Sequence, residues 1–498
     1  MELRHRAKIL ATVGPSSNSD KVLTDLLNAG VDGFRLNTSH STIDIHKKTF
    51  DLIRNLNEFT PILVDLPGVK IRTGVLNVPI YVNNGDHVVL IPSHLHSHQV
   101  VKEQDRMLIP VDYEFLASDV KKGDSIFIND GIIHLKVTDI QSNFVHVEVL
   151  AGGQIKSRKG INLPDSDLKS NVPTKDDIER IKFACDVDAD YLAVSFVSKA
   201  SEIDEVRSII ELHSTRSIPI IAKIEKKTAL KNFSEILHTS NGIMVARGDL
   251  GVEIPPERVP VEQRRIIKQT NKASKLCIVA TQMLESMIQN PVATRAEISD
   301  IYTSVDQGAD TVMLSGETAS GNYPVKAVEV MHKVVSLAYS EMSKRRKPED
   351  YDSTFGGYVR IQELLAHAVK TMSKKARDDK DNIKLIIIPT RYGSTAKVIA
   401  KYRPRTPIIA SSPNIHVIRE LNLVYGIHTM FIPEHSTQED LYRGGLSSNL
   451  FKFTLRRCLD EGILEKDDNF MAVSSSSISP TSPTNLVGLF TAKDIPLD

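Results

Sequence analysis

The sequence is poor in the features that mark several large classes of protein. It has only three cysteines, Cys185, Cys277 and Cys458, which lie far apart and form no Cys-x-x-Cys pair. Neither a disulfide framework nor a structural zinc site is indicated, and a reducing compartment such as the cytoplasm is expected. No run approaches the ~20 apolar residues that cross a bilayer, and the apolar stretch near the N-terminus is too short for a signal sequence.

The chain also lacks an excess of either charge. Lys and Arg together number 62, as do Asp and Glu, so the formal net charge at neutral pH is zero. Because a nucleic-acid binder needs a basic surface, that balance argues against such a partner for the chain as a whole. Two kinds of nucleotide motif are missing as well, the GxxxxGK[ST] loop and the HRD and DFG segments of protein kinases.

Eight short apolar runs predict the strands of one domain. They alternate with stretches of helical period such as 174–187, where Thr174 and Asp177 form an N-cap signal. Nearly continuous apolar strands alternating with helices indicate a parallel sheet covered by helices, and eight such units favour a closed (β/α)8 barrel. The pattern alone also allows an open doubly wound sheet. The runs are 7–14, 33–39, 61–66, 190–196, 218–225, 242–248, 277–283 and 310–316.

The length of 498 residues leaves room for about three domains. After the third run, short alternating apolar segments separated by turns such as NNGD and KKGD predict a small inserted β-barrel. Such an insertion lies over the carboxyl end of the larger barrel and can act as a lid that excludes water. We therefore predict an α/β protein in which 1–66 and 167–342 form a (β/α)8 barrel, 67–166 form a β-barrel lid domain, and 343–498 form a C-terminal α/β domain.

Charged side chains end several of the predicted strands. The segment PIIAKIEK places Lys223 and Glu225 two residues apart, and therefore on one face of a strand. Burying a charge is costly without a partner, so the pair needs an explanation. Because the carboxyl ends of barrel strands share one rim, we expect further polar groups to converge there. These groups are Arg35, Asn37, Ser39, Asp65, Asp249 and Thr281.

The chemistry of these groups is coherent. Glu225 and Asp249 offer the hard oxygen ligands that Mg²⁺ prefers. Arg35 can grip a phosphoryl group through its planar fork, and Lys223 adds a second cation. Such a set serves phosphoryl transfer or the stabilisation of an enolate. Taken singly, a Lys-x-Glu pair is commonly an ion pair and an Asp after a strand is commonly a helix cap, but the agreement of five strand ends favours a catalytic site.

Several long segments resemble those of the pyruvate kinases. They are FRLNTSH (34–40), SRKGINLP (157–164), KIE (223–225), MVARGDLGVEIP (244–255), ATQMLESM (280–287), NPVATRAEISD (290–300) and MLSGETASGNYP (313–324). The resemblance implies transfer of a phosphoryl group from phosphoenolpyruvate to ADP, giving pyruvate and ATP in the final step of glycolysis, with Mg²⁺ or Mn²⁺ as cofactor. It also implies a cytoplasmic homotetramer under allosteric control, with neither nucleic acid nor a membrane as partner.

The same resemblance implies roles for individual residues at the substrate. Lys223 matches the lysine that stabilises charge on the phosphoryl group and the enolate, and Arg35 matches the phosphate-binding arginine. Thr281 matches the threonine on the proton route. The backbone amides near Gly248 and Asp249 join Thr281 at the substrate.

Metal and nucleotide positions follow in the same way. Glu225 and Asp249 match the ligands of the divalent metal. A further set matches positions on the nucleotide side, the last of them carried by the lid. This set is Asn37, His40, Arg72, Lys159 and Asp130.

One segment departs from the family pattern. The family usually has DTKGPEIRTG after the third strand, whereas this chain has DLPGVKIRTG at 65–74, so that Lys70 replaces a glutamate. That substitution changes the local charge by two units, and an ammonium group can take the place of a monovalent cation. We therefore predict activity without K⁺; the alternative is that Lys70 points to solvent and K⁺ still binds. In the usual form, K⁺ is held at the positions of Asn37, Ser39, Asp65 and Leu66.

The third region predicts an effector site. Thr390 ends a strand, and Gly393, Ser394 and Thr395 open a helix, so hydroxyls and helix amides together form a phosphate nest. The resemblance implies a phosphorylated effector there, with the Ser-rich loop 474–484 closing over it. Helix capping by Ser394 is the alternative.

Two other functions fit parts of the pattern. A barrel aldolase or lyase would also use Mg²⁺ and a pyruvate enolate, but it needs no nucleotide lid, and the insertion with Arg72 and Lys159 argues against it. A regulatory binding protein without activity would be expected to lose its charged site residues. All of them are present: Arg35, Lys223, Glu225 and Asp249.

Overall fold

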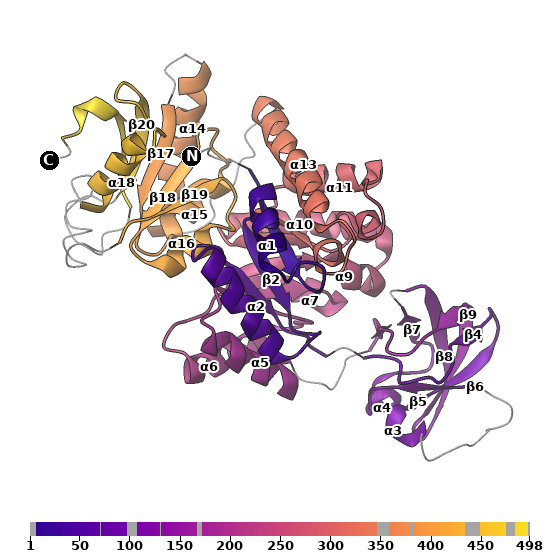
Figure 1. Cartoon of the computed structure of the whole chain (residues 1–498). Coiled ribbons are helices and arrows are strands. Elements are labelled where there is room, and N and C mark those ends of the chain that lie inside the picture. The colour runs from indigo at the N-terminus through magenta and orange to yellow at the C-terminus, as the bar shows by residue number, and fades with distance from the viewer. Residues whose placement is uncertain are drawn as a thin grey trace.

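The computed structural model contains a barrel, a separate β domain and a C-terminal α/β domain (Figure 1). It describes residues 6–69, 71–96, 107–129, 131–166, 172–345, 358–378, 383–433, 449–474 and 484–496. Three of the predicted features, Lys70, Asp130 and most of the Ser-rich loop, lie outside the described residues.

Eight parallel strands form the barrel, and each overlaps one of the eight apolar runs. They are β1 Lys8–Val13, β2 Gly33–Asn37, β3 Ile62–Asp65, β12 Tyr191–Val194, β13 Ile220–Ile224, β14 Gly242–Ala246, β15 Leu276–Ala280 and β16 Thr311–Leu314. Their hydrogen-bonded order, β1-β16-β15-β14-β13-β12-β3-β2, closes on itself. The prediction of a closed barrel is confirmed, and the open sheet is wrong.

Helices follow the barrel strands and cover their outer side. The capping box predicted at Thr174 is present, because its hydroxyl accepts from the Asp177 amide while the Asp177 carboxylate accepts from the Thr174 amide. Among the helices of the described residues, none is long and apolar enough to cross a membrane. The barrel helices are α1 Asp20–Ala29, α2 Ile43–Leu56, α5 Lys175–Asp186, α6 Ala200–His213, α7 Lys227–Lys231, α8 Phe233–Thr239, α9 Arg247–Glu253, α10 Val259–Lys272, α11 Arg295–Asp306, α12 Gly316–Ala319 and α13 Pro324–Arg345.

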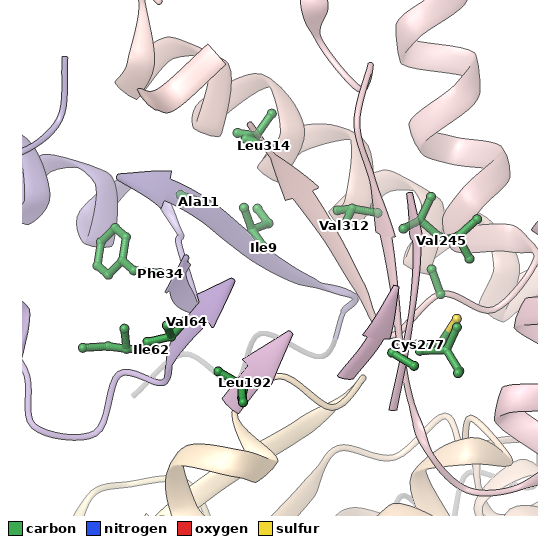
Figure 2. Packing of buried hydrophobic residues seen from close by; sticks show 14 of the residues in the cluster. Ile9, Ala11, Phe34, Ile62, Val64, Leu192, Val245, Cys277, Val312 and Leu314 are labelled. Atoms are coloured by element: carbon green, nitrogen blue, oxygen red, sulfur yellow. The ribbon is translucent and has the colours of Figure 1, made fainter. Parts of the chain in front are cut away.

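The barrel strands sort their side chains by alternation. Every second residue, such as Ile9 and Ala11 of β1 or Ile62 and Val64 of β3, points outward into the apolar layer beneath the helices (Figure 2). The residues between them point to the barrel interior. Because both faces are buried, the strands read as continuous apolar runs.

The inserted domain is built from short strands. A six-stranded sheet has the order β11-β7-β8-β9-β5-β6, and β10 pairs with β4. Residues 71–74 connect the two edges of the larger sheet, because the Ile161 amide donates to the Ile71 carbonyl and the Gly74 amide donates to the Pro110 carbonyl. The elements are β4 Ile80–Val82, β5 His87–Pro92, α3 Ser93–His96, β6 Met107–Val111, α4 Leu116–Asp119, β7 Ser125–Ile128, β8 Ile133–Gln141, β9 Phe144–Ala151, β10 Gly153–Ile155 and β11 Ile161–Asn162.

The C-terminal domain contains the predicted α/β pattern. Its sheet has the order β19-β18-β17-β20-β21, in which β21 alone runs antiparallel to its neighbour. Its helices are α14 Tyr358–Asp378, α15 Ser394–Lys401, α16 Ile415–Leu421 and α18 Asn449–Asp460. Its strands are β17 Ile383–Pro389, β18 Ile408–Ser412, β19 Ile427–Phe431, β20 Asn469–Ser474 and β21 Leu486–Thr491.

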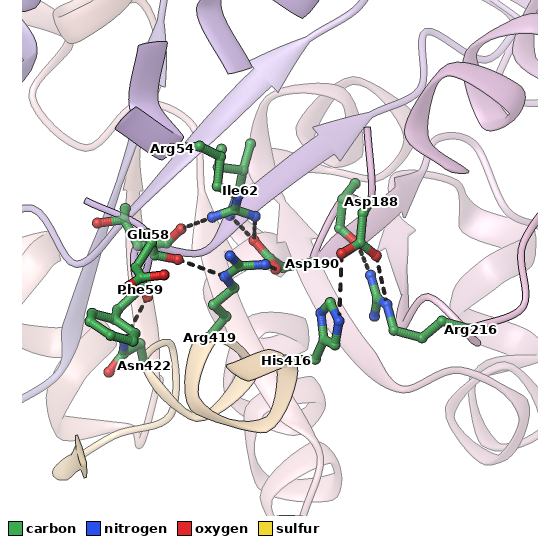
Figure 3. Close-up of polar contacts among 12 residues, drawn as sticks. Arg54, Glu58, Phe59, Ile62, Asp188, Asp190, Arg216, His416, Arg419 and Asn422 are labelled. Atoms are coloured by element: carbon green, nitrogen blue, oxygen red, sulfur yellow. Dashed lines mark hydrogen bonds and ion pairs between the residues drawn. The ribbon is translucent and has the colours of Figure 1, made fainter. Parts of the chain in front are cut away.

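Ionic contacts join α16 to the amino-terminal end of the barrel (Figure 3). Asp190, directly before β12, is buried between the guanidinium groups of Arg54 and Arg419 and also accepts the Ile62 amide at 2.7 Å. Arg419 donates in addition to the Glu58 carbonyl at 2.7 Å. These contacts fix the C-terminal domain against the barrel face opposite the strand ends that carry the polar groups.

This arrangement predicts a large difference between two neighbouring aspartates. Asp190→Asn should lower the free energy of unfolding by about 3 kcal/mol, because it leaves the buried guanidinium group of Arg419 and the partly buried one of Arg54 without this countercharge. Asp188→Asn is the matched control, since the Asp188 side chain is 51% exposed and its loss should cost less than about 1 kcal/mol. Urea unfolding followed by circular dichroism measures both. Equal losses in the two variants would contradict this account of the interface.

Candidate active site

Alternation along the strands directs the polar side chains into the barrel. On β13 the apolar residues Ile220, Ala222 and Ile224 occupy the outer layer, so Lys223 and Glu225 take the opposite phase. The charged pair therefore sits inside the mouth of the barrel, and not on its surface.

A cavity of about 100 Å³ lies at the carboxyl ends of the strands. It brings together residues from four of the strand ends that the sequence singled out, those of β2, β13, β14 and β15. Asp65, at the end of β3, does not line the cavity but contacts Arg35 and Lys223. The polar residues that line it are Arg35, Asn37, Ser39, Ser195, Lys223, Glu225, Asp249 and Thr281. Apolar walls come from Pro67, Phe196, Met244, Ala246, Ala280 and Met313.

Lys223 is the centre of the buried charges. Its Nζ lies 3.0 Å from Glu225 Oε1 and 3.3 Å from Asp65 Oδ1, and it donates to Ser195 Oγ at 2.6 Å. Burial opposes the charged form, but the carboxylates of Asp65 and Glu225 outweigh it and raise the pKa of Lys223 above its usual value. The lysine is therefore an ammonium group at neutral pH.

Asp65 pairs with two cations at once. Its Oδ2 accepts from Arg35 Nε at 2.7 Å, while its Oδ1 faces Lys223. Burial alone would raise the pKa of Asp65, but Lys223 and Arg35 together hold it below its usual value. Arg35 also donates to Thr12 Oγ1 at 3.1 Å. These bonds fix the direction of its guanidinium group.

Two carboxylates, Glu225 and Asp249, face the same cavity. The pKa of Glu225 is raised, first by burial and further by the negative charge of Asp249, while Lys223 acts in the opposite direction. A cation between the two carboxylates would relieve that repulsion, so the donor set fits a divalent metal such as Mg²⁺. No group of three or more His, Cys, Asp or Glu suited to a metal occurs in the described residues. Mg²⁺ typically binds one or two protein carboxylates together with water and substrate oxygens.

The opposite wall of the cavity has an unusual backbone. Thr281 and Gln282, which follow β15, have φ of 69° and 55°, a left-handed conformation that is uncommon for residues other than glycine and especially for a β-branched one. The Thr281 hydroxyl accepts from the Gly248 amide at 2.8 Å and donates to the Ala280 carbonyl at 2.6 Å. This hydroxyl therefore ties the end of β15 to the first turn of α9.

Some predicted residues do not reach this cavity. His40 is exposed, and its carbonyl accepts from His46 Nε2 at 2.7 Å. Arg72 and Lys159 lie at the base of the inserted domain. Arg72 directly precedes Thr73, and the Thr73 amide donates to the Lys159 carbonyl at 2.8 Å. Figure 1 shows the strands of that domain standing apart from the barrel.

Three of the four residues expected around a monovalent cation have oxygens with protein partners. Asp65 bonds to the two cations described above, and the Leu66 carbonyl accepts from Ser195 Oγ at 2.7 Å. The Asn37 side-chain oxygen accepts from the Ser39 amide at 3.2 Å.

The predicted effector residues lie around the start of α15. Gly393, with φ of 76°, is the residue that caps this helix, and no side chain caps it, so the capping role considered for Ser394 is wrong. The Thr390 hydroxyl instead accepts from the Gly393 amide at 2.9 Å. Thr395 Oγ1 lies 2.6 Å from Thr484 Oγ1, so the end of the Ser-rich segment adjoins the helix start.

Two further residues of the site, both just after β12, are not among those predicted from the sequence. Ser195 links Lys223 to the Leu66 carbonyl, and its inward phase in DYLAVSF was a readable signal. Phe196 donates its amide to Glu225 Oε2 at 2.6 Å. A contact made by the main chain leaves no signal in the residue type, and Phe196 also has a positive φ of 56°.

Comparison with known proteins identifies the family of the chain. Two family models match the chain, one for the barrel domain of pyruvate kinase over residues 4–328 and one for its alpha/beta domain over residues 366–489. The pyruvate kinase of Clostridium perfringens is 36% identical over 494 residues, which cover 97% of this chain and 98% of the relative. That of Thermococcus litoralis is 35% identical over 504 residues, with 98% and 99% covered. The chain is thus a phosphotransferase that belongs to the pyruvate kinase family.

Proposed function

We propose that the chain transfers the phosphoryl group of phosphoenolpyruvate to ADP in a Mg²⁺-dependent reaction, giving pyruvate and ATP with uptake of one proton. One observation carries the proposal. The cations of Arg35 and Lys223, held by Asp65, line the same cavity as the carboxylates of Glu225 and Asp249. Such an arrangement of fixed charges suits the transfer of an anionic group.

The two cations have different tasks in this proposal. Arg35 has a fixed guanidinium plane and binds the phosphoryl oxygens before the reaction. Lys223 is a compact charge, and it stabilises the negative charge on the phosphoryl group in transit and on the enolate oxygen left behind. Because both cations are already oriented by Asp65, little reorganisation is needed when the substrate binds.

The metal site and the proton route complete the scheme. Glu225 and Asp249 would hold Mg²⁺ or Mn²⁺, which when bound neutralises charge on the phosphoryl and enolate oxygens. The backbone amides near Gly248 and Asp249 bind the substrate carboxylate. Thr281 Oγ1 lies beside them and serves the route by which the methylene carbon of the enolate gains its proton.

The lid supplies the nucleotide side. We assign the lid to residues 67–166, the barrel to 1–66 and 167–342, and the C-terminal domain to 343–498. Closure of the lid brings three of the nucleotide-side residues towards the two at the end of β2 and excludes water from the cavity. The three are Arg72, Asp130 and Lys159, and the two are Asn37 and His40.

Membership of the family supports the wider setting that we propose. The reaction is the last step of glycolysis, the enzyme works in the cytoplasm as a homotetramer, and neither nucleic acid nor a membrane is a partner. A phosphorylated effector binds at the start of α15, with hydroxyls and helix amides as donors. The residues of that site are Thr390, Gly393, Ser394 and Thr395.

Substitution of the central lysine tests the proposal. Wild-type protein should release pyruvate from phosphoenolpyruvate only when both ADP and Mg²⁺ are present, as followed by a coupled assay. Lys223→Met keeps the hydrocarbon stem but removes the charge, and it should lower kcat by roughly 10³-fold, as expected for loss of a group that stabilises developing charge.

Lys182→Met, on the exposed face of α5, is the matched control and should keep wild-type kcat. Circular dichroism confirms that both variants are folded. Pyruvate formation by the wild type without ADP would overturn the proposal, and so would full activity in Lys223→Met.

A second test concerns the monovalent cation. We propose that Lys70 takes the place of K⁺, so turnover in Na⁺ or tetramethylammonium buffer should equal turnover in K⁺. Lys70→Glu restores the glutamate of the usual family pattern and should make the activity depend on K⁺, by roughly tenfold or more, since opposite charges at such a site differ by several kcal/mol.

Lys121→Glu, at an exposed turn of the lid, makes the same charge change away from the site and should create no such dependence. A strict K⁺ requirement in the wild type would refute this assignment of Lys70.

A further inference from the structure

We propose that Arg247 is a positioning residue, which holds Thr281 and the first turn of α9 in the arrangement that the reaction needs, and that Asp300 fixes its orientation. The proposal rests on the proposed function, because Thr281 and Asp249 are given their roles there. Arg247 itself does not line the cavity.

The hydrogen bonds of Arg247 are concentrated on one short segment. Its Nη2 donates to the Thr281 carbonyl at 2.6 Å and to the Gln282 carbonyl at 3.2 Å, and its Nε donates to the Thr281 carbonyl at 3.3 Å. The guanidinium group is buried. It therefore binds the main chain of both residues that have positive φ after β15.

That segment needs an external restraint. A non-glycine residue persists in the left-handed region only where its surroundings impose it, and here two such residues are adjacent. If the segment relaxed, the Thr281 hydroxyl would leave the Gly248 amide, to which it is bonded at 2.8 Å. Arg247 prevents this relaxation by donating hydrogen bonds to the carbonyl groups of Thr281 and Gln282.

Arg247 also belongs to the segment that carries the metal side of the cavity. Its main chain begins α9, so Gly248 and Asp249 follow it directly. One residue thus connects the two walls, because its backbone positions Asp249 while its side chain positions Thr281. A shift of either wall by about 1 Å is enough to cost a large factor in rate.

The guanidinium group is itself held from behind by two helices. Its Nη1 donates to Asp300 Oδ2 of α11 at 2.6 Å and to Gln263 Oε1 of α10 at 3.4 Å. Gln263 is buried and bonds in turn to Gln307 Oε1 at 2.9 Å. Only the planar fork of arginine serves carbonyl groups on one side and a carboxylate on the other, so lysine does not replace it.

The chain provides a matched control at the opposite end of the barrel. Arg216 bonds to the Asp188 carboxylate at 2.8 Å and to the carbonyl groups of Ala189 and Ser217. It makes the same kinds of bond as Arg247, but its partners lie far from the cavity. Arg216 is more exposed than Arg247, at 20% against 9% of the side chain, but a purely structural role for such bonds predicts a similar effect on kcat at both positions.

The experiment compares Arg247→Lys, Asp300→Asn and Arg216→Lys in the full-length protein. Steady-state kinetics with phosphoenolpyruvate, ADP and Mg²⁺ should show kcat lowered by roughly 10- to 100-fold in Arg247→Lys, with KM for phosphoenolpyruvate changed by less than about threefold. Asp300→Asn should lower kcat in the same direction by a smaller factor, and Arg216→Lys should leave it unchanged.

Two further readouts separate positioning from general stability. In D₂O, the enzyme should exchange the methyl protons of pyruvate for deuterium, and NMR measures the rate of this exchange. The rate should fall in parallel with kcat, because the proposed function places Thr281 on the proton route. Amide hydrogen exchange should rise in residues 280–284 of Arg247→Lys, while the barrel strands away from this segment stay protected.

The outcomes are distinct. Wild-type kcat together with unchanged exchange of 280–284 in Arg247→Lys would overturn the proposal, as would an equal loss of kcat in Arg216→Lys. If Arg247→Lys does not fold, the same two measurements on Asp300→Asn test the proposal, and wild-type kcat with unchanged exchange of 280–284 in that variant would overturn it. Absence of pyruvate formation in the wild type would remove the proposed function, whereas the exchange measurement would still show whether Arg247 holds the segment.

Discussion

The balance of four buried charges is the constraint on which the site depends. Arg35 and Lys223 are cations, Asp65 and Glu225 are anions, and each lies within a salt-bridge distance of an opposite charge. None of them is stable alone in this place, because an unpaired charge in the interior is far more costly than a paired one. The set is therefore charged and ordered before any substrate arrives, and Asp249 adds a negative charge that a divalent cation can neutralise.

The barrel holds these charges in place through rigid strands and through strained residues that follow the strands. Each barrel strand is buried and is hydrogen bonded to a neighbouring strand on both sides. Uncommon backbone conformations with positive φ occur in residues just after the carboxyl ends of these strands. Thr281 directly follows β15 and Phe196 lies two residues after the end of β12, and both have positive φ, at a cost of about 1–3 kcal/mol each. The strain turns the Phe196 amide towards Glu225 and the Thr281 hydroxyl towards Gly248.

Periodicity predicted most of the scaffold and part of the site. The eight barrel strands were readable because each is apolar throughout, and the inward phase of Lys223 followed from the same alternation. The roles of the Phe196 amide and of Gly393 in place of Ser394 depend on backbone angles, which residue types do not encode. The distance between the lid and the barrel is set by tertiary contacts and has no local pattern.

The way the chain enters and leaves the lid has a consequence for modularity. The entering segment, 71–74, and the leaving segment, 158–161, are bonded side by side, with the Thr73 amide on the Lys159 carbonyl at 2.8 Å. Because they are bonded to each other, the two crossings form a single connection between the inserted domain and the barrel. Because its two ends are neighbours, the whole insertion forms a separable unit. If the insertion were excised, a short bridging peptide would suffice to rejoin the barrel.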